Sequence, residues 1–119
     1  TDFLFEYARS LSKTGAYEKS NAVLLRAVKI SADPMIYNIM GKNYQAKRQY
    51  GDASICFRKA ANLMPSLMYP YYLLALLYEE TGEQQKASEA AAAFLAKKAK
   101  VESTATKEMR EKMKELLEN

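Results

Sequence analysis

Small and large apolar residues recur along this chain at a spacing of 33 or 34 positions. At a spacing of 34, the residues Tyr37, Gly41, Tyr44 and Ala53 are followed by Tyr71, Ala75, Tyr78 and Ala87. At a spacing of 33, the residues Tyr17, Leu24 and Ala27 are followed by Tyr50, Phe57 and Ala60. A period of this length indicates stacked units that each bury one face on the next. We therefore expect units at residues 1–33, 34–67 and 68–101, followed by a separate segment at 102–119.

Each unit is predicted to be a pair of helices. In the unit 34–67, Pro34 suits the first position of a helix, and an apolar stripe with a 3.6-residue period follows it. That stripe consists of Tyr37, Met40, Gly41 and Tyr44. After a short polar turn, the second helix carries Ala53, Phe57 and Ala60, and Pro65 lies beyond its end. The small residues Gly41 and Ala53 are expected to let the two helices approach closely.

The unit 34–67 resembles the tetratricopeptide repeat, and Tyr37 stands where that family usually has Trp. The third unit keeps the pattern through Ala87. It then has Ala91 where a large residue is expected and Phe94 where a small one is expected, so we expect its second helix to be shifted or packed differently. The resemblance implies an all-α fold, a right-handed α-α superhelix of three helix pairs plus a capping helix, all in one domain.

The segment 102–119 is predicted to be that capping helix. Ser103 or Thr104 can cap its N-terminus. The expected apolar stripe consists of Ala105, Met109, Met113, Leu116 and Leu117. A helix with one apolar stripe and a polar outer face can cover the exposed side of a last repeat.

Composition limits the chemistry that this chain can perform. The chain has 119 residues, 49% of them hydrophobic, and it contains no His and one Cys. These counts exclude acid–base or nucleophilic schemes that need His, and zinc or haem sites built from His or paired Cys. We expect a non-enzymatic chain with no cofactor and no metal, and Cys56 is expected to be a buried small residue. No apolar run approaches the length of a membrane span.

Charge alone does not indicate a nucleic-acid partner. The net charge is +4, but the 18 Lys and Arg residues are spread over all the predicted helices, with Glu between them. The densest basic stretch, 97–100, ends a predicted helix, where cations interact favourably with the helix dipole. Glu79 and Glu80 are adjacent on a helix and point about 100° apart, so they do not form a catalytic pair. We expect them, with Glu83, to be solvated.

In tetratricopeptide repeats, the first helix of each unit lines a concave groove through its second, fifth, ninth and twelfth positions. The resemblance therefore implies a ligand groove formed by Phe5, Arg9, Met35, Asn38, Lys42, Gln45, Tyr69, Tyr72 and Leu76, with Asp2, Ser12 and Glu79 at its margins. Aromatic rings beside cations suit an extended peptide or a sugar face. A protein or peptide partner is the main expectation and a glycan the alternative. Packing of Tyr69 and Tyr72 in the seam between repeats is equally compatible with the sequence.

One sub-function of the family can be rejected from the residues. Chaperone-tail-binding repeats hold two carboxylates with Lys, Asn and Arg side chains. The corresponding positions here are Phe5, Arg9, Ile39, Tyr69 and Leu73. Only Arg9 among them is basic, so this chain does not carry that clamp.

A narrower similarity covers about residues 60–117. The run from Met64 to Gly82 and the ending from Lys100 to Arg110 resemble the C-terminal repeat region of bacterial O-antigen ligase-like or polymerase-like membrane proteins. This similarity implies a bacterial module tethered to the inner membrane, in which the multi-spanning part performs glycan transfer. The alternative within that system is a domain that presents the glycan substrate. Because the chain opens with Thr1 rather than Met, we expect it to be a piece of a larger protein.

The start of the chain is expected to self-associate. Phe3, Leu4 and Phe5 are three consecutive apolar residues, and a helix can turn only part of such a run toward its own partner. An uncovered apolar edge pairs with another copy or is covered by other sequence. We therefore expect any self-association to use the first helix through Phe3 and Phe5.

Overall fold

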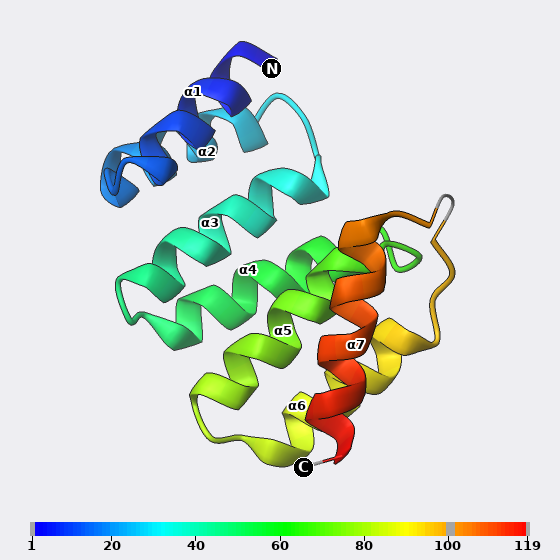
Figure 1. Ribbon diagram of the computed structural model, residues 1–119. Helices are drawn as coiled ribbons and strands as arrows, with labels where there is room; N and C mark the ends of the chain where they lie inside the picture. Colours follow the sequence, from blue (N-terminus) through cyan, green and yellow to red (C-terminus); the bar gives the residue numbers. More distant parts are fainter. Residues whose placement is uncertain (1, 100–101, 119) are drawn as a thin grey trace. The chain divides into compact units, whose positions relative to one another are not determined.

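The structure is a computed structural model that describes residues 2–99 and 102–118. Within those ranges the chain forms seven α-helices and no strand (Figure 1). The helices are α1 Asp2–Lys13, α2 Tyr17–Val28, α3 Pro34–Ala46, α4 Tyr50–Leu63, α5 Tyr69–Glu80, α6 Gln84–Leu95 and α7 Thr104–Glu118. The predicted all-α class is confirmed, and the first six helices follow one another as three pairs.

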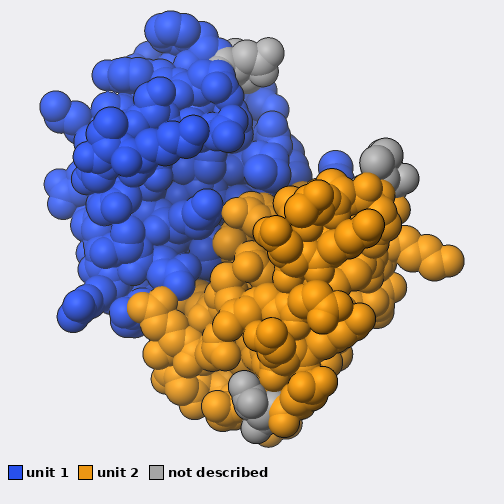
Figure 2. Space-filling model, viewed as in Figure 1, with its two compact units in different colours: residues 1–64 blue, residues 65–119 orange. Residues whose placement is uncertain are grey.

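The chain divides into two compact units, Thr1–Met64 and Pro65–Asn119, which are coloured separately in Figure 2. Unit 1 holds α1 to α4, and unit 2 holds α5 to α7. The expectation that all the helices form one domain stays a prediction.

The helices of unit 1 pack in chain order around a shared core. The α1–α2 and α3–α4 pairs are each in close contact, α3 packs against α2, and α3 also touches α1. The buried core cluster of this unit consists of Ala8, Leu24, Ala27, Ile36, Ile39, Met40 and Cys56. Leu4, Phe5, Val23, Val28, Tyr37 and Tyr44 pack around it while half-buried.

The close approach of α3 and α4 depends on Gly41. A Cβ atom added to Gly41 would overlap the ring of Phe57, which is itself fully buried. The expectation that Gly41 allows a tight helix crossing is therefore confirmed, and the ring of Phe57 occupies the space that a side chain would take.

The turns inside the three helix pairs share one geometry. In each turn, a backbone N–H donates to the carbonyl five residues earlier: Ala16 to Leu11, Gln49 to Tyr44, and Glu83 to Tyr78, at 2.8–2.9 Å. This bond pattern ends a helix with a residue in the left-handed conformation, usually glycine. Gly15 and Gly82 fill that place in the outer pairs, whereas Arg48 fills it in the middle pair with φ of 61°.

In unit 2, α6 keeps the register of the repeat but exchanges the sizes of two buried residues. The buried positions of α6 are Ala87, Ala90, Ala91 and Phe94, which lie 34 residues after Ala53, Cys56, Phe57 and Ala60 of α4. Ala91 corresponds to Phe57 but is small. The large ring of α6 is Phe94, which lies three residues after Ala91. The helix is thus packed differently from α4 without a shift in register, and Ala75 can replace glycine on α5.

The last helix, α7, packs against α6 and touches α5, in the way that α3 packs against α2 and touches α1. It therefore takes the place that the first helix of a following repeat would occupy. Its buried residues are Thr106, Met113 and Leu116, with Met109 half-buried. Ala105 and Leu117, which were expected in the stripe, are exposed, because they lie at its two edges, each about 20° around the helix from a buried residue. Ser103 caps the helix, since its Oγ accepts the Thr106 N–H at 3.1 Å.

Candidate functional site

In unit 1, the expected groove residues lie on α1 and α3, two helices that touch each other. Phe5 is half-buried against the core, whereas Arg9 is exposed and pairs with Glu6 at 3.4 Å. Lys42 is exposed at the same repeat position of α3 as Arg9 on α1. Both first helices of this unit therefore present a cation at their ninth position.

The most unusual polar group at the groove positions is the side chain of Asn38. It is only 1% exposed, and its Oδ1 has no hydrogen-bond partner among the described residues. Its Nδ2 lies 3.6 Å from the sulfur of Met35, and a thioether is a weak acceptor. A buried polar atom without a partner costs about 1–3 kcal/mol. Unpaired polar groups of this kind are rare in folded proteins, so this amide is a candidate ligand contact.

Next to these positions lies a polar network that sequence reasoning missed. Asn43 on α3 donates from Nδ2 to Ser20 Oγ at 2.9 Å and to Asn21 Oδ1 at 2.7 Å, both on α2. Its Oδ1 accepts the hydroxyl of Ser12 on α1 at 2.6 Å, and Ser20 donates to the Ala8 carbonyl at 2.8 Å. The network joins three helices, and its buried members are mutually satisfied. The available signal was two polar residues at buried repeat positions, since Ser20 corresponds to Ala53 and Asn43 to Leu77.

In unit 2, the expected groove residues Tyr69, Tyr72 and Leu76 all lie on α5 and are half-buried. The rings of Tyr69 and Tyr72 stack with centroids 6.2 Å apart, and Tyr72 also packs against the buried ring of Phe94 at 5.9 Å. These contacts support the packing interpretation for Tyr72. They also reduce the ring area that a sugar could cover.

The two remaining groove positions of unit 1, Met35 and Gln45, are half-buried on α3. At the margins, the side chain of Asp2 lies outside the described residues, Ser12 belongs to the buried network, and Glu79 pairs with Lys112 of α7 at 3.9 Å. Of the clamp positions, Ile39 and Leu73 are buried. A charged residue at either position could not reach a ligand without disrupting the packing of the core.

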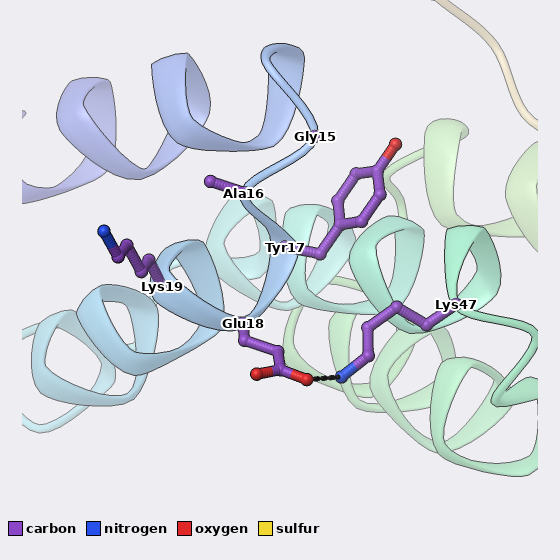
Figure 3. Close-up of a pocket in the computed structure, with 6 residues that line it drawn as sticks. All are labelled: Gly15, Ala16, Tyr17, Glu18, Lys19 and Lys47. Carbon is purple, nitrogen blue, oxygen red and sulfur yellow. Dashed lines mark hydrogen bonds and ion pairs between the residues drawn. The ribbon is translucent and has the colours of Figure 1, made fainter.

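A shallow hollow of about 390 Å³ lies at the turn between α1 and α2 (Figure 3). Its lining residues are Gly15, Ala16, Tyr17, Glu18, Lys19 and Lys47. The ammonium of Lys47 reaches the carboxylate of Glu18 at 3.1 Å, while Lys19 points away from that pair. A second hollow, of about 460 Å³, lies at the corresponding turn between α5 and α6 and contains the Glu83–Lys86 pair. The hollows recur at corresponding turns, and an ion pair lies at each of them.

Two titratable groups with a clearly shifted pKa are Cys56 and Glu83. Burial raises the pKa of the Cys56 thiol to about 11, with nearby Lys59 opposing the shift and Asp52 adding to it. The thiol is therefore protonated at neutral pH, as expected for a buried structural cysteine. A hydrogen bond from Thr81 and contact with Lys86 lower the pKa of the exposed Glu83. In the described part of the chain, no group of three potential metal ligands is present.

In both units lysines lie over tyrosine rings, one of them Lys97 from the basic stretch at the end of α6. Lys59 lies 5.6 Å from the ring centre of Tyr37, and Lys97 lies 4.8 Å from that of Tyr71. Tyr37 and Tyr71 occupy the same repeat position, and in both units a cation covers this ring, from within α4 in one case and from just after α6 in the other. Cation–π contacts of this kind are individually weak. Lys100, in the same basic stretch as Lys97, lies outside the described residues.

No family model matches the sequence, and no curated protein is significantly similar to it. Solved structures do match. The type III secretion chaperone SycD of Yersinia enterocolitica, in complex with a peptide of the translocator YopD, is 19% identical with a TM-score of 0.88. The match covers 98% of this chain and 88% of that one.

Two further matches come from other systems. The tetratricopeptide domain of Sgt2 from Aspergillus fumigatus is 21% identical, with a TM-score of 0.80 and coverage of 98% and 78%. The first tetratricopeptide domain of Spaghetti (RPAP3), bound to an HSP90 peptide, is 14% identical, with a TM-score of 0.78 and coverage of 98% and 92%. The chain therefore has the tetratricopeptide-repeat fold, and the predicted fold class is confirmed. No helix in the described ranges is long and apolar enough to cross a bilayer.

Proposed function

We propose that this chain is a non-catalytic interaction module that binds an extended, acidic peptide segment of a protein partner along α1 and α3. The observation that carries this proposal is the buried Asn38 amide, whose oxygen has no partner at a groove position. A peptide main chain offers N–H donors that match such an acceptor once the side chains that cover the oxygen move aside. SycD and RPAP3 were each solved with a bound peptide, which supports the same class of ligand here.

The charge of the peptide follows from Arg9 and Lys42. Both are exposed cations at the ninth position of neighbouring first helices. The Arg9–Glu6 pair is exposed and i,i+3 in spacing, so it stabilises the free protein little and is easily exchanged for a ligand carboxylate. Hydrogen bonds between charged groups contribute about 1.5–3 kcal/mol each, enough to select an acidic segment over a basic one.

The test uses two fluorescein-labelled pools of random peptides, one with Glu and one with Lys at fixed alternate positions, followed by fluorescence polarisation. We expect the acidic pool to bind and the basic pool to bind weakly or not at all. Replacing Arg9→Ala or Lys42→Ala is expected to raise Kd about tenfold, the factor that corresponds to about 1.4 kcal/mol. Arg58→Ala on α4 is the matched control, because it removes an exposed cation from a second helix.

Asn38→Leu gives a second measurement on the same site. Removing an amide that has no acceptor partner should leave the melting temperature unchanged or higher, because the penalty of the unpaired oxygen disappears. The same change should weaken peptide binding. Equal binding of both pools, or equal effects of Arg9→Ala and Arg58→Ala, would refute the proposal.

The cellular context is a finer part of the proposal. The similarity of residues 60–117 to the C-terminal region of O-antigen ligase-like proteins favours a bacterial module attached to a glycan ligase of the inner membrane. Finding multiple hydrophobic segments in the parent sequence would support this context, and a parent without them would exclude it. Adding oligosaccharide to the polarisation assay tests the glycan alternative, because a glycan ligand would displace the labelled peptides.

A further inference from the structure

We propose that the face of α1 and α2 that points away from α3 docks a second copy of this chain, with α1 of each copy lying on α2 of the other. This inference goes beyond the proposed function, because none of its residues is among the groove residues. It rests on exposed apolar side chains, on the antiparallel path of the two helices, and on the different charges that the helices carry.

The side of α1 and α2 that faces α3 is marked by the polar network, through Ser12 on α1 and Asn21 on α2. At 100° per residue, Phe3 lies about 180° and Tyr7 about 140° around α1 from Ser12. Arg26 lies about 140° around α2 from Asn21. These side chains therefore belong to the opposite face, which we call the outer edge of unit 1.

Large apolar groups are exposed on the outer edge. Phe3 is 79% exposed, Tyr7 is 49% exposed, and Ile30, in the turn that follows α2, is 66% exposed. The rings of Phe3 and Tyr7 stack on each other with centroids 6.4 Å apart, so they form one aromatic surface. Phe5, which was expected to share this role with Phe3, instead packs against the core of unit 1. Its position in the helix places it on the side facing α3.

The path of the chain places the ends of this surface together. Helices α1 and α2 run antiparallel, and the first turn of α1 lies beside the last turn of α2 (Figure 1). Phe3 and Ile30 are therefore at the same end of the outer edge. A two-fold axis parallel to these helices would place Phe3 of one copy against Ile30 of the other. The same axis would place Ile30 of the first copy against Phe3 of the second.

The charges favour a second copy as the occupant. On the outer edge, α1 presents aromatic rings with the carboxylate of Glu6 at their border, whereas α2 presents the exposed cations Lys19 and Arg26. In the single copy Glu6 pairs with Arg9 at 3.4 Å, an exposed pair that a cation of the other copy can replace. Cations are attracted to the faces of aromatic rings and to carboxylates. Each half of the edge thus complements the other half. In a two-fold dimer, α1 of each copy contacts the cations on α2 of the other, so both halves of the edge are paired in both copies. A partner that is only acidic or only basic would pair with one half.

The test is sedimentation equilibrium of the purified chain over a range of concentrations. We expect a reversible dimer. Phe3→Glu and Tyr7→Glu should each weaken it roughly tenfold to a hundredfold, because each places a charge in a buried apolar contact. Leu25→Glu is the matched control, since Leu25 is 50% exposed on α2 but lies only about 40° from the side that faces α3. That variant should dimerise as the unaltered chain does.

A charge exchange distinguishes a second copy from other occupants. Arg26→Glu should weaken the dimer, and adding Glu6→Arg to that variant should restore it, because the two residues meet across the two-fold axis. Circular dichroism of each variant verifies that the helices are intact. A chain that stays monomeric at every concentration, or a dimer that ignores Phe3→Glu and Tyr7→Glu, would overturn the proposal.

Discussion

At the scale of single residues, the size of one side chain dictates what its neighbour can be. Gly41 is required because the ring of Phe57 fills the space beside it. In unit 2, the residue corresponding to Phe57 is Ala91, and the residue corresponding to Gly41 is Ala75. The ring has moved to Phe94, so a methyl group fits on α5. The exchange of sizes keeps both helix pairs filled without changing their register.

This pairing predicts a measurable coupling between Gly41 and Phe57. Gly41→Ala should lower the free energy of unfolding by about 1–3 kcal/mol through overpacking, as measured by urea denaturation. The loss should be smaller in a Phe57→Leu background, because the smaller side chain leaves room for the methyl group. Gly51→Ala is the control. A Cβ there has no neighbour within 4 Å, so the change should be neutral or stabilising. Equal losses in both backgrounds would show that the two residues do not compete for space.

At the scale of helices, the way α3 is fixed on the first pair depends on a buried amide. Asn43 joins α2 and α1 through Ser20, Asn21 and Ser12. Apolar packing is not directional, whereas a hydrogen bond requires one alignment of donor and acceptor. The network therefore selects one register of α3 among those that the apolar stripe alone would allow.

Asn43→Ala is expected to lower the free energy of unfolding by about 1–3 kcal/mol, because Ser20 and Asn21 would keep buried polar atoms without their partner. Asn62→Ala on the exposed side of α4 is the matched control, and it should change stability by less than about 0.5 kcal/mol. Thermal or urea unfolding of both variants provides the comparison. If the two substitutions have the same effect, the network does not contribute to the register.

The helices could be predicted from the sequence because their signals are local and repeated. The 33- and 34-residue spacing located three helix pairs, and Ser103 marked the start of α7. The details of packing could not be predicted in the same way. The sequence showed the departure at Ala91 and Phe94, but whether α6 shifts or repacks depends on contacts between helices. The predicted stripe of α7 included Ala105 and Leu117, which are exposed. At the candidate site, Arg9 and Lys42 followed from the repeat positions. The unpaired state of Asn38 depends on what surrounds it in three dimensions, which no spacing reveals.

At the scale of the whole molecule, the chain consists of two compact units with separate sets of contacts. Repeat proteins gain stability from each unit and from the contacts between neighbours, so a local change need not weaken the whole chain equally. Unit 1 contains the Gly41–Phe57 contact and the Asn43 network. Unit 2 contains α7, whose Met113 side chain is fully buried. Each unit therefore contains a buried contact that a single substitution can disrupt, at Gly41 in unit 1 and at Met113 in unit 2.

Native-state hydrogen exchange can show whether the units open separately. Gly41→Ala should speed exchange mainly at amides of residues 2–64, and Met113→Ala, a core truncation that costs about 2–5 kcal/mol, mainly at residues 65–99 and 102–118. The reason is that Gly41→Ala overpacks a contact inside unit 1, whereas Met113→Ala opens a cavity inside unit 2. Leu117→Ala is the control for Met113→Ala, because Leu117 is 41% exposed, and it should speed exchange much less. If either core variant sped exchange equally throughout the chain, the two units would open as one cooperative domain, as the repeat pattern alone had suggested.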